Sequence, residues 1–369
     1  KKMNKNKRVV VGMSGGVDSS VTALLLKQQG YDVVGLFMRN WEYGIKGSQC
    51  PNRIEFEDAK KVGALIGIEV IGKDFVKEYR DRVFDVFLEG LKQGLTPNPD
   101  ILCNREIKFN VFLNEAKKMG ADMIATGHYA KIAKYKDHFV LDTPKDSSKD
   151  QTYFLHALSS EQLSHAMFPL GDLTKKEVRE IAREHNLPVS DKKDSTGICF
   201  IGNQKFDEFI TQHLQAIPGD ILDENGKVIG KHKGLVCYTL GQRKGIGLGG
   251  LKGNESENNT HKPWFVAAKD VINNTLTIVQ DTNHPLLMSK TVEAKQMHWV
   301  LEVAPKVGDK LMAQVRYRQQ KQACTVVEAN NEKVIVEFDN PQRAVTLGQS
   351  LVLYSGDYCL GGGFISFYK

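Results

Sequence analysis

The first half of the chain alternates between short apolar runs and longer segments with helical periodicity. Residues 8–13 (RVVVGM) and 31–38 (YDVVGLFM) are β-branched runs of the kind that form buried parallel strands. Between them, residues 19–30 predict a helix that ends at its terminal glycine. Residues 55–68 place their apolar side chains on one helical face. This alternation predicts a doubly wound α/β domain with a parallel sheet.

The alternation continues to about residue 190. Thr174 and Glu177 have the spacing of a capping box, and Pro188 ends the helix that follows them. The other elements expected here are a strand near 69–75, helices over roughly 76–93 and 105–120, a strand over 121–129, and a hairpin over 131–141 with Lys136-Asp137 at its turn.

The pattern changes from about residue 206. Residues 219–234 carry the turn residues of a β-meander, and residues 247–262 form a polar loop. From about residue 290, alternating runs such as KVIVEF predict an antiparallel β-barrel. We therefore expect three domains, namely a catalytic α/β domain over 1–205, a small, mostly β central domain over 206–288, and a C-terminal barrel over 289–369.

The composition limits the possible partners and the cellular compartment, but it does not identify a function. The chain has 50 Lys and Arg against 44 Asp and Glu, a net charge of +6, which permits a polyanionic partner but does not establish one. No apolar run approaches the ~20 residues of a membrane helix, and we expect a cytoplasmic protein. The cysteines are scattered without a CxxC pair, so each is judged by its surroundings; they are Cys50, Cys103, Cys199, Cys237, Cys324 and Cys359.

The segment GMSGGVDSS (12–20) joins a predicted strand to a predicted helix. Its glycines let backbone N–H groups close around an anion, and the positive end of the helix dipole points to the same place. Asp18 is a candidate ligand for Mg²⁺ beside the phosphates. The lysine of the GxxxxGK[ST] loop is missing, as is the GxGxxG pattern. The candidate phosphate-binding residues are Gly12, Met13, Ser14, Gly15, Gly16, Val17, Asp18 and Ser19.

Two cysteines lie on predicted loops of the α/β domain. We expect Cys103 just ahead of a helix that starts near Asn104, where the helix dipole, Arg105 and Lys108 would favour its thiolate. A buried structural cysteine is the alternative. Cys199 follows an Asp-Ser-Thr-Gly run that we interpret as a flexible mount, and its local sequence leaves a packed thiol and a reactive thiol equally open.

The order of the motifs is more specific than any one of them. SGGxDS resembles the PP-loop of enzymes that cleave ATP between the α and β phosphates. The whole series resembles the tRNA-specific 2-thiouridylase family: GMSGGVDSS, FMRNW, TPNPDILCNREIKF, ATGHYA, KDQTYFL, KKDSTGICFIG, YTLGQRKG, RYRQ and PQRAVTLGQ. The resemblance runs from the N-terminus to about residue 360. One departure is Glu42, where many members carry an aspartate, and the residues that follow it are also unusual.

The resemblance implies the reaction. The loop over 12–19 would bind ATP, together with the positions of Met38 and Gly127. ATP would adenylate the C2 oxygen of the wobble uridine of tRNA and release pyrophosphate. Cys199 would carry a persulfide whose terminal sulfur attacks C2. Cys103 would then release sulfide or resolve the intermediate, which leaves a Cys103–Cys199 disulfide.

The resemblance also implies substrate contacts. Asn98, Pro99 and Asp100 match contacts to the target base, which must leave its stack to react. Asp100 is either a general acid/base or only a hydrogen-bonding group. The remaining matches are tRNA contacts, at His128, Lys149, Asp150, Gln151, Arg316, Tyr317 and Gln349, each of which has a purely structural alternative.

The expected cofactors are ATP and Mg²⁺. The expected partners are tRNA, with Lys, Glu and Gln acceptors, and a sulfur donor that is a cysteine desulfurase or a relay protein. Two other functions compete with this one. A PP-loop synthetase of a small molecule explains the nucleotide loop but leaves both cysteines unused, and an RNA-binding or sulfur-carrier module without catalysis leaves the intact loop unexplained.

Overall fold

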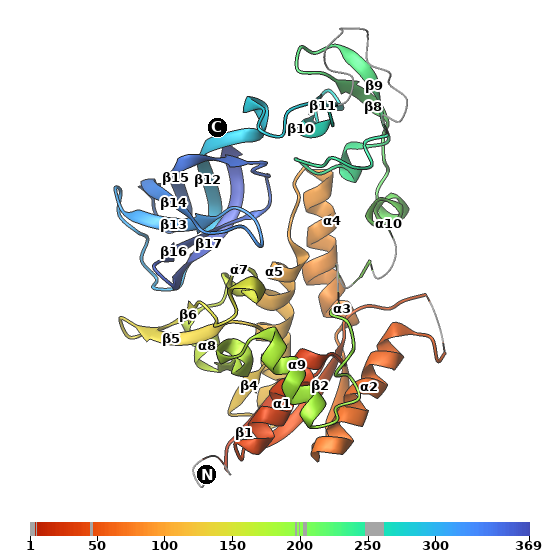
Figure 1. The fold of residues 1–369 in the computed structure, drawn as a ribbon, viewed down its shortest axis with the longest axis vertical. Helices are drawn as coiled ribbons and strands as arrows, with labels where there is room; N and C mark the ends of the chain where they lie inside the picture. The colour runs from red at the N-terminus through yellow and green to blue at the C-terminus, as the bar shows by residue number, and fades with distance from the viewer. Residues whose placement is uncertain are drawn as a thin grey trace.

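The computed structural model describes residues 4, 6–44, 47–195, 198, 200–201, 205–247 and 262–369. Figure 1 shows an α/β domain, a small β unit linked to it through α10 (Phe206–His213), and a β-barrel formed by the C-terminal part of the chain. No helix among the described residues is long and apolar enough to cross a membrane.

The α/β domain is built on a five-stranded parallel sheet with the order β3-β2-β1-β4-β7. The strands are β1 (Arg8–Gly12), β2 (Asp32–Arg39), β3 (Val70–Asp74), β4 (Met123–Ala125) and β7 (Ala166–Met167). The core residues Val9, Val10 and Val11 are completely buried because both faces of the sheet are covered. The predicted doubly wound domain is confirmed, although β4 is shorter than expected because the chain turns at Gly127, close to the backbone of Asp18.

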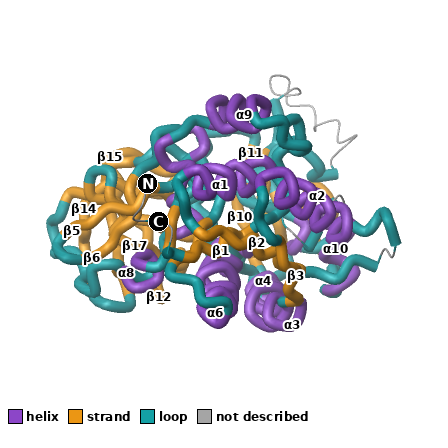
Figure 2. The backbone as a smooth tube through the Cα atoms, turned by 90° about the horizontal axis from the view of Figure 1, so that it is seen from below, coloured by secondary structure: helices purple, strands orange, loops and turns teal. Residues whose placement is uncertain are grey.

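Helices cover both faces of this sheet (Figure 2). On one face lie α1 (Val17–Gln28), α2 (Pro51–Ile66) and α9 (Lys175–Glu184), and on the other lie α4 (Asp85–Lys92) and α6 (Phe112–Lys118). The predicted capping box is present, since the Thr174 side chain accepts from the Glu177 N–H and the Glu177 side chain bonds back to Thr174. Shorter helices are α7 (Thr152–Leu155) and α8 (Ser160–Ser164), with 3₁₀ turns at Ser147–Lys149 and Pro169–Asp172.

Two helical segments contain π-helical turns. The first comprises α3 (Val76–Tyr79), a π-helical segment Arg80–Phe84, and α4. The second comprises α5 (Pro99–Cys103), a π-helical segment Asn104–Val111, and α6. The expected helix over 105–120 therefore starts earlier, at Pro99, because the Asn98 side chain accepts from two backbone N–H groups and caps it there.

The predicted hairpin is present as β5 (Lys131–Tyr135) and β6 (His138–Asp142), with Lys136 and Asp137 at positive φ in the turn. It joins the sheet of the C-terminal barrel, where Asp142 pairs with Tyr358. The barrel strands are β12 (Met288–Trp299), β13 (Lys310–Gln314), β14 (Gln322–Ala329), β15 (Lys333–Arg343), β16 (Ser350–Ser355) and β17 (Tyr358–Tyr368). Pairing of β12 with β17 closes this antiparallel barrel, as the sequence predicted.

The central unit is a four-stranded sheet with the order β10-β11-β8-β9. Its strands are β8 (Gly219–Leu222), β9 (Val228–His232), β10 (Phe265–Asp270) and β11 (Thr275–Val279), and 3₁₀ turns lie at Leu235–Cys237 and Pro285–Leu287. Most of the polar loop expected over 247–262 lies outside the described residues.

The barrel contacts the α/β domain at the loop that precedes Asn98. The Thr96 N–H donates to the Leu347 carbonyl at 2.8 Å, and the Gln349 side-chain amide donates to the Thr96 carbonyl at 2.6 Å. Gly348 allows this close approach, because a Cβ there would lie 2.9 Å from the backbone N of Thr96. The C-terminal domain thus fixes a loop of the N-terminal domain.

Candidate active site

The nucleotide loop connects the end of β1 to the start of α1. Gly15 has a φ of +81°, and a Cβ there would lie 2.5 Å from the Glu55 carbonyl oxygen, so the turn requires glycine. The Ser19 hydroxyl accepts from the Ser14 N–H at 3.1 Å, and this hydrogen bond holds the two ends of the loop together. Gly16 occupies the N-cap of α1 and has no side chain to satisfy the first helical N–H groups. These groups are available to an anion.

Of the other residues expected near ATP, Gly127 lies directly against this loop. A Cβ on Gly127 would lie 2.9 Å from the Ser19 N, so the turn after β4 approaches the start of α1 closely. Met13 is buried, and its N–H donates to the Leu36 carbonyl at 2.9 Å. Met38 lies near the end of β2 and contacts two apolar clusters. The structure thus brings Met13 and Gly127 to the loop.

Asp18 lies in the first turn of α1 and has two partners. Its Oδ1 accepts from the Tyr129 hydroxyl at 2.8 Å and from Lys175 Nζ at 2.7 Å. Burial and the charge of Asp18 raise the pKa of Tyr129, which keeps its proton for this bond. Both contacts use Oδ1, and Mg²⁺ in nucleotide sites is bound through one or two carboxylates together with phosphates. Asp18 therefore fits a Mg²⁺ ligand that acts with ATP, although no group of three or more acidic, His or Cys ligands occurs among the described residues.

Cations reach the loop from distant parts of the chain. Lys175 comes from the first turn of α9, and Lys192 Nζ lies 3.1 Å from the Gly15 carbonyl oxygen and 2.9 Å from Asp58 Oδ2. The sequence shows that the usual loop lysine is missing, and the tertiary structure supplies these two instead. Sequence reasoning missed Lys175, Tyr129 and Asp194 in this site. The capping box at the start of α9 was the one sequence signal near Lys175. It predicted where the helix begins, but not that Lys175 would lie beside Asp18.

Cys103 lies at the end of α5 and is 5% exposed. It belongs to an apolar cluster rich in aromatic side chains, including Trp41, Tyr79, Phe84 and Phe87. The expectation that Cys103 precedes a helix start near Asn104 is wrong, because the helix already begins at Pro99. The helix dipole therefore acts on Asn98-Pro99-Asp100 more directly than on Cys103.

Cys199 itself lies outside the described residues, as do positions 196 and 197 of the expected flexible mount. Both of its immediate neighbours are described. Phe200 is 2% exposed and its ring centroid lies 5.6 Å from that of Trp41. Ile198 packs against the same cluster, which also contains Cys103. The two cysteines, far apart in sequence, therefore belong to segments that share one apolar cluster.

The expected target-base residues form the start of α5. The Asn98 side-chain oxygen accepts from the Asp100 N–H at 2.9 Å and from the Ile101 N–H at 3.4 Å. Burial raises the pKa of the Asp100 carboxyl, and the charge of Lys108 opposes this only in part. A carboxyl whose pKa is raised by burial can exchange its proton at a higher pH than an exposed carboxyl.

The expected tRNA-contact residues of the α/β domain make internal contacts. His128 is 8% exposed, its Nδ1 lies 2.6 Å from the Thr126 hydroxyl, and burial lowers its pKa well below the usual range. Lys149 pairs with Asp194 at 3.2 Å. Asp150 accepts from the Thr152 N–H, and Gln151 accepts from the Tyr129 N–H, each at 2.9 Å. These contacts hold the segment in place beside the nucleotide loop.

Of the barrel residues expected to contact tRNA, Tyr317 contacts α7 and Gln349 contacts the loop before α5. The Tyr317 ring packs against that of Phe154, with centroids 4.0 Å apart and the planes tilted by 39°, and Arg316 is exposed. Gln349 holds Thr96, as described above. The structure brings Gln349 next to the target-base segment.

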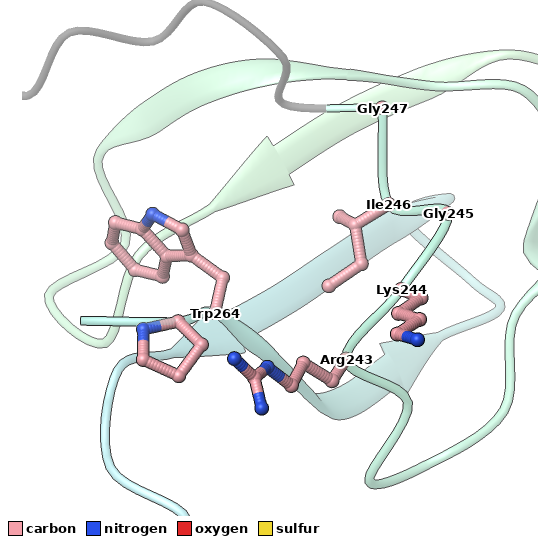
Figure 3. A pocket seen from close by; sticks show the side chains of 7 residues that line it. Arg243, Lys244, Gly245, Ile246, Gly247 and Trp264 are labelled. Atoms are coloured by element: carbon pink, nitrogen blue, oxygen red, sulfur yellow. The ribbon is translucent and has the colours of Figure 1, made fainter. Parts of the chain in front are cut away.

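A cavity of about 600 Å³ lies in the central unit (Figure 3). The residues that line it include Arg243, Lys244, Pro263 and Trp264. None of the described candidate site residues lines this cavity, so the central unit has a cationic and aromatic surface of its own.

Comparisons with known proteins match the whole chain. Three family models match consecutive segments: a tRNA methyl transferase HUP domain over residues 7–203, a tRNA methyl transferase PRC-barrel domain over 207–280, and an aminomethyltransferase β-barrel domain over 289–365. The chain is 95% identical to tRNA-specific 2-thiouridylase MnmA 2 of Aliarcobacter butzleri (strain RM4018), with 100% of both chains covered. It is 53% identical to tRNA-specific 2-thiouridylase MnmA of Burkholderia ambifaria (strain ATCC BAA-244), over 98% of this chain and 93% of the relative.

Among solved structures, the U34-tRNA thiolase NcsA from Methanococcus maripaludis is similar over 57% of this chain and 66% of its own. Its TM-score is 0.35 and its sequence identity is 21%. This partial likeness carries no argument about the site.

Proposed function

This chain belongs to the tRNA-specific 2-thiouridylase family, and from that premise we propose that it replaces the C2 oxygen of the wobble uridine of tRNA with sulfur. One observation about the site supports the proposal most. Cys103 and both neighbours of Cys199 share an apolar cluster at the edge of the sheet where the nucleotide loop also lies. Trp41 and Phe75 of that cluster follow the carboxyl ends of β2 and β3, and the loop follows that of β1. Carboxyl ends of parallel strands lie at one edge, the usual place for an active site.

The nucleotide loop would hold the phosphates of ATP through the free N–H groups at the start of α1. Asp18 would bind Mg²⁺ with them, and Met38 and Gly127 would line the adenine side. ATP supplies an adenylyl group that turns the C2 oxygen into a good leaving group. Family membership does not support the alternative synthetase of a small molecule, which would leave Cys103 and Cys199 without a role.

The cysteines would carry the sulfur. The terminal sulfur of a Cys199 persulfide attacks C2, and AMP leaves with the C2 oxygen. The Cys103 thiolate then attacks Cys199 Sγ and breaks the S–S bond. The product is 2-thiouridine together with a Cys103–Cys199 disulfide, which an external thiol must reduce before the next turnover. The aromatic cluster would exclude water that could otherwise hydrolyse the adenylated base.

Asp100 would exchange a proton with the base or with Cys103. Because burial raises its pKa, Asp100 gains and loses its proton closer to neutral pH than an exposed carboxyl does. An Asp100→Asn variant separates this role from simple hydrogen bonding. If Asp100 acts as a base, the variant loses the fall in kcat that the wild type shows as the pH drops; a purely hydrogen-bonding role leaves that fall in place.

The remaining partners are proposed on the family's chemistry. Lys149, Arg316 and Tyr317 would contact the tRNA, whose acceptors are those for Lys, Glu and Gln. The sulfur would come from a cysteine desulfurase or a relay protein, in a cytoplasm that keeps thiols reduced.

The test is a thiolation assay with ATP, Mg²⁺, a sulfur donor and tRNA, read out as 2-thiouridine and AMP. Cys199→Ser and Cys103→Ser should each lower thiolation by about 10³-fold or more, as the loss of a nucleophile does. Cys237→Ser, in the central unit, is the matched control and should retain full activity. Absence of 2-thiouridine with the wild type, or full single-turnover activity of Cys199→Ser, would contradict the proposal.

A further inference from the structure

A chain of ion pairs joins the nucleotide loop to the segment that leads to Cys199. Lys175 Nζ lies 2.7 Å from Asp18 Oδ1 and 2.6 Å from Asp194 Oδ1. Asp18 belongs to the loop, and Asp194 precedes Cys199 by only five positions. The Lys175 side chain is 12% exposed, so water screens these pairs less than it screens pairs at an open surface.

The fold holds Lys175 firmly at this place. It is the first residue of α9, directly after the N-cap Thr174, and its N–H donates to Asp146 Oδ2 at 2.9 Å. Its ammonium also lies 5.9 Å from the centre of the Tyr129 ring, whose hydroxyl bonds to the same Asp18 oxygen. Ordering a lysine side chain costs up to about 2 kcal/mol of conformational entropy, which the contacts at both ends offset.

Asp194 lies at the other end of this series of ion pairs. It also pairs with Lys149 at 3.2 Å and with Arg179 at 3.4 Å. Although partial burial opposes the shift, the hydrogen bond and charge of Lys175, joined by those of Lys149, lower the pKa of Asp194, so its side chain is a carboxylate at neutral pH. Of these three cations, Lys175 is the one that also pairs with Asp18.

A second contact attaches the same segment to the loop. Lys192 Nζ bonds to the Gly15 carbonyl oxygen at 3.1 Å and pairs with Asp58 at 2.9 Å. Residues 192–194 are therefore bound to the nucleotide loop at two points, one through Lys192 directly and one through Lys175. Neither contact involves the cysteines, so this connection is separate from the apolar cluster.

We propose that Lys175 is a positioning residue that couples occupancy of the nucleotide loop to the sulfur-transfer step. This inference rests on the proposed function. The phosphates of ATP attract the Lys175 ammonium, and Mg²⁺ competes with it for Asp18. Binding of the nucleotide therefore changes how strongly Lys175 holds Asp194, and with it the start of the segment that carries Cys199. Such coupling is reciprocal, because one charge is shared by two sites.

The experiment measures the two halves of the reaction separately. Pyrophosphate release, which reports adenylation of the base, is followed with tRNA and enzyme that carries no persulfide, because AMP leaves only when sulfur attacks C2. Sulfur transfer is followed in a single turnover from enzyme loaded with a ³⁵S persulfide, at saturating ATP. The variants are Asp194→Asn, Lys175→Met and Lys175→Arg. Lys145→Met is the matched control. Lys145 pairs at 2.7 Å with Glu177, which like Lys175 belongs to α9, and this pair does not involve the nucleotide loop.

Asp194→Asn should slow sulfur transfer by about 10- to 100-fold, the range expected for a misplaced reacting group, and leave the KM for ATP and the rate of pyrophosphate release within about threefold of wild type. Lys175→Met should slow both halves, and Lys175→Arg should restore part of each. Lys145→Met should behave as wild type. A merely structural role would instead lower both halves and the melting temperature together.

The inference is overturned if Asp194→Asn transfers sulfur at the wild-type rate, or if the Lys175→Met defect disappears at high ATP in both halves. Failure of the proposed function looks different, since the wild type would then form no 2-thiouridine at all. If Lys175→Met does not fold, Asp194→Asn decides alone, because a half-exposed carboxylate is replaced there by an amide of the same size.

Discussion

Two aspartates of the same domain show how differently its two sides are built. Asp100 lies beside the apolar cluster of Cys103, where burial raises its pKa. Asp194 lies beside the nucleotide loop, where Lys175 and Lys149 lower its pKa against the effect of partial burial. The residue type is the same, and only the surroundings decide whether the charge is disfavoured or stabilised.

The difference corresponds to the two halves of the proposed reaction. The nucleotide side must attract phosphates, so it contains free N–H groups and shared cations that remain accessible to an anion. The cysteine side must keep water away from an activated base and a persulfide, so it contains aromatic rings. Substitutions on the cysteine side should therefore affect folding and water exclusion. Substitutions on the nucleotide side should affect nucleotide binding.

The largest expected effect comes from the apolar side. Phe200→Ala removes a fully buried ring that packs on Trp41, Phe84 and Phe209, and should lower the free energy of unfolding by about 3–5 kcal/mol. Chemical denaturation measures this. Phe367→Ala is the control, because that ring is 52% exposed and should cost less than about 0.5 kcal/mol. Equal losses for both variants would mean that the cluster does not hold the segment of Cys199.

The next effect is on the nucleotide side. Gly15→Ala puts a Cβ against the Glu55 carbonyl at a positive φ, a strain of roughly 1–3 kcal/mol that distorts the loop. The dissociation constant for ATP, measured by calorimetry, should rise by about 10- to 100-fold. Gly67→Ala has a similar φ of +78° but no atom within 4 Å, so it should lower stability without changing ATP affinity. Equal ATP affinities in the two variants would contradict this account of the loop.

A smaller effect tests the helix that carries Lys175. Thr174→Ala removes the capping box of α9 and should cost about 1 kcal/mol, seen as a lower melting temperature. Ser159→Ala removes the capping box of α8, away from Lys175, and should cost a similar amount. Only Thr174→Ala should also slow single-turnover sulfur transfer. If both variants slow it alike, the start of α9 has no special role.

The smallest effect concerns the two aspartates directly. The lowered pKa of Asp194 means that its carboxylate stabilises the fold above the unfolded pKa of about 3.9, and that this contribution is lost as the pH falls through the folded pKa. Asp194→Asn should therefore cost about 1 kcal/mol or less at pH 7, after solvent screening, and this cost should shrink as the pH falls through the folded pKa.

Asp100 should behave in the opposite way. Because its folded pKa is raised, the ionised carboxyl is unfavourable at neutral pH and the penalty disappears as the pH falls towards the unfolded pKa. Asp100→Asn should be at least as stable as wild type at pH 7 and equal to it near pH 3. Denaturation curves at several pH values check both variants, and slopes of the same sign would refute the comparison.

Much of the fold was predictable because its signals are local. The valines of β1 indicate a strand buried on both faces, and Thr174 with Glu177 indicates the start of α9, which the structure confirms. The helix that carries Cys103 was expected to start near Asn104, but it starts at Pro99, because the Asn98 side chain caps it there. The joining of the β5–β6 hairpin to the barrel could not be predicted either, since it depends on strand pairing between residues more than two hundred positions apart.

Sequence patterns were enough to predict the alternation of strands and helices, the phosphate-binding loop, the barrel pattern and, through the order of the motifs, the family. These follow from short-range spacing and from backbone freedom at single residues such as Gly15. The tertiary structure decided which charges meet and which side chains exclude water. Lys175 became the cation beside Asp18, and the neighbours of Cys199 joined Cys103 in one cluster, because packing of the sheet and helices brings together groups that no sequence spacing connects.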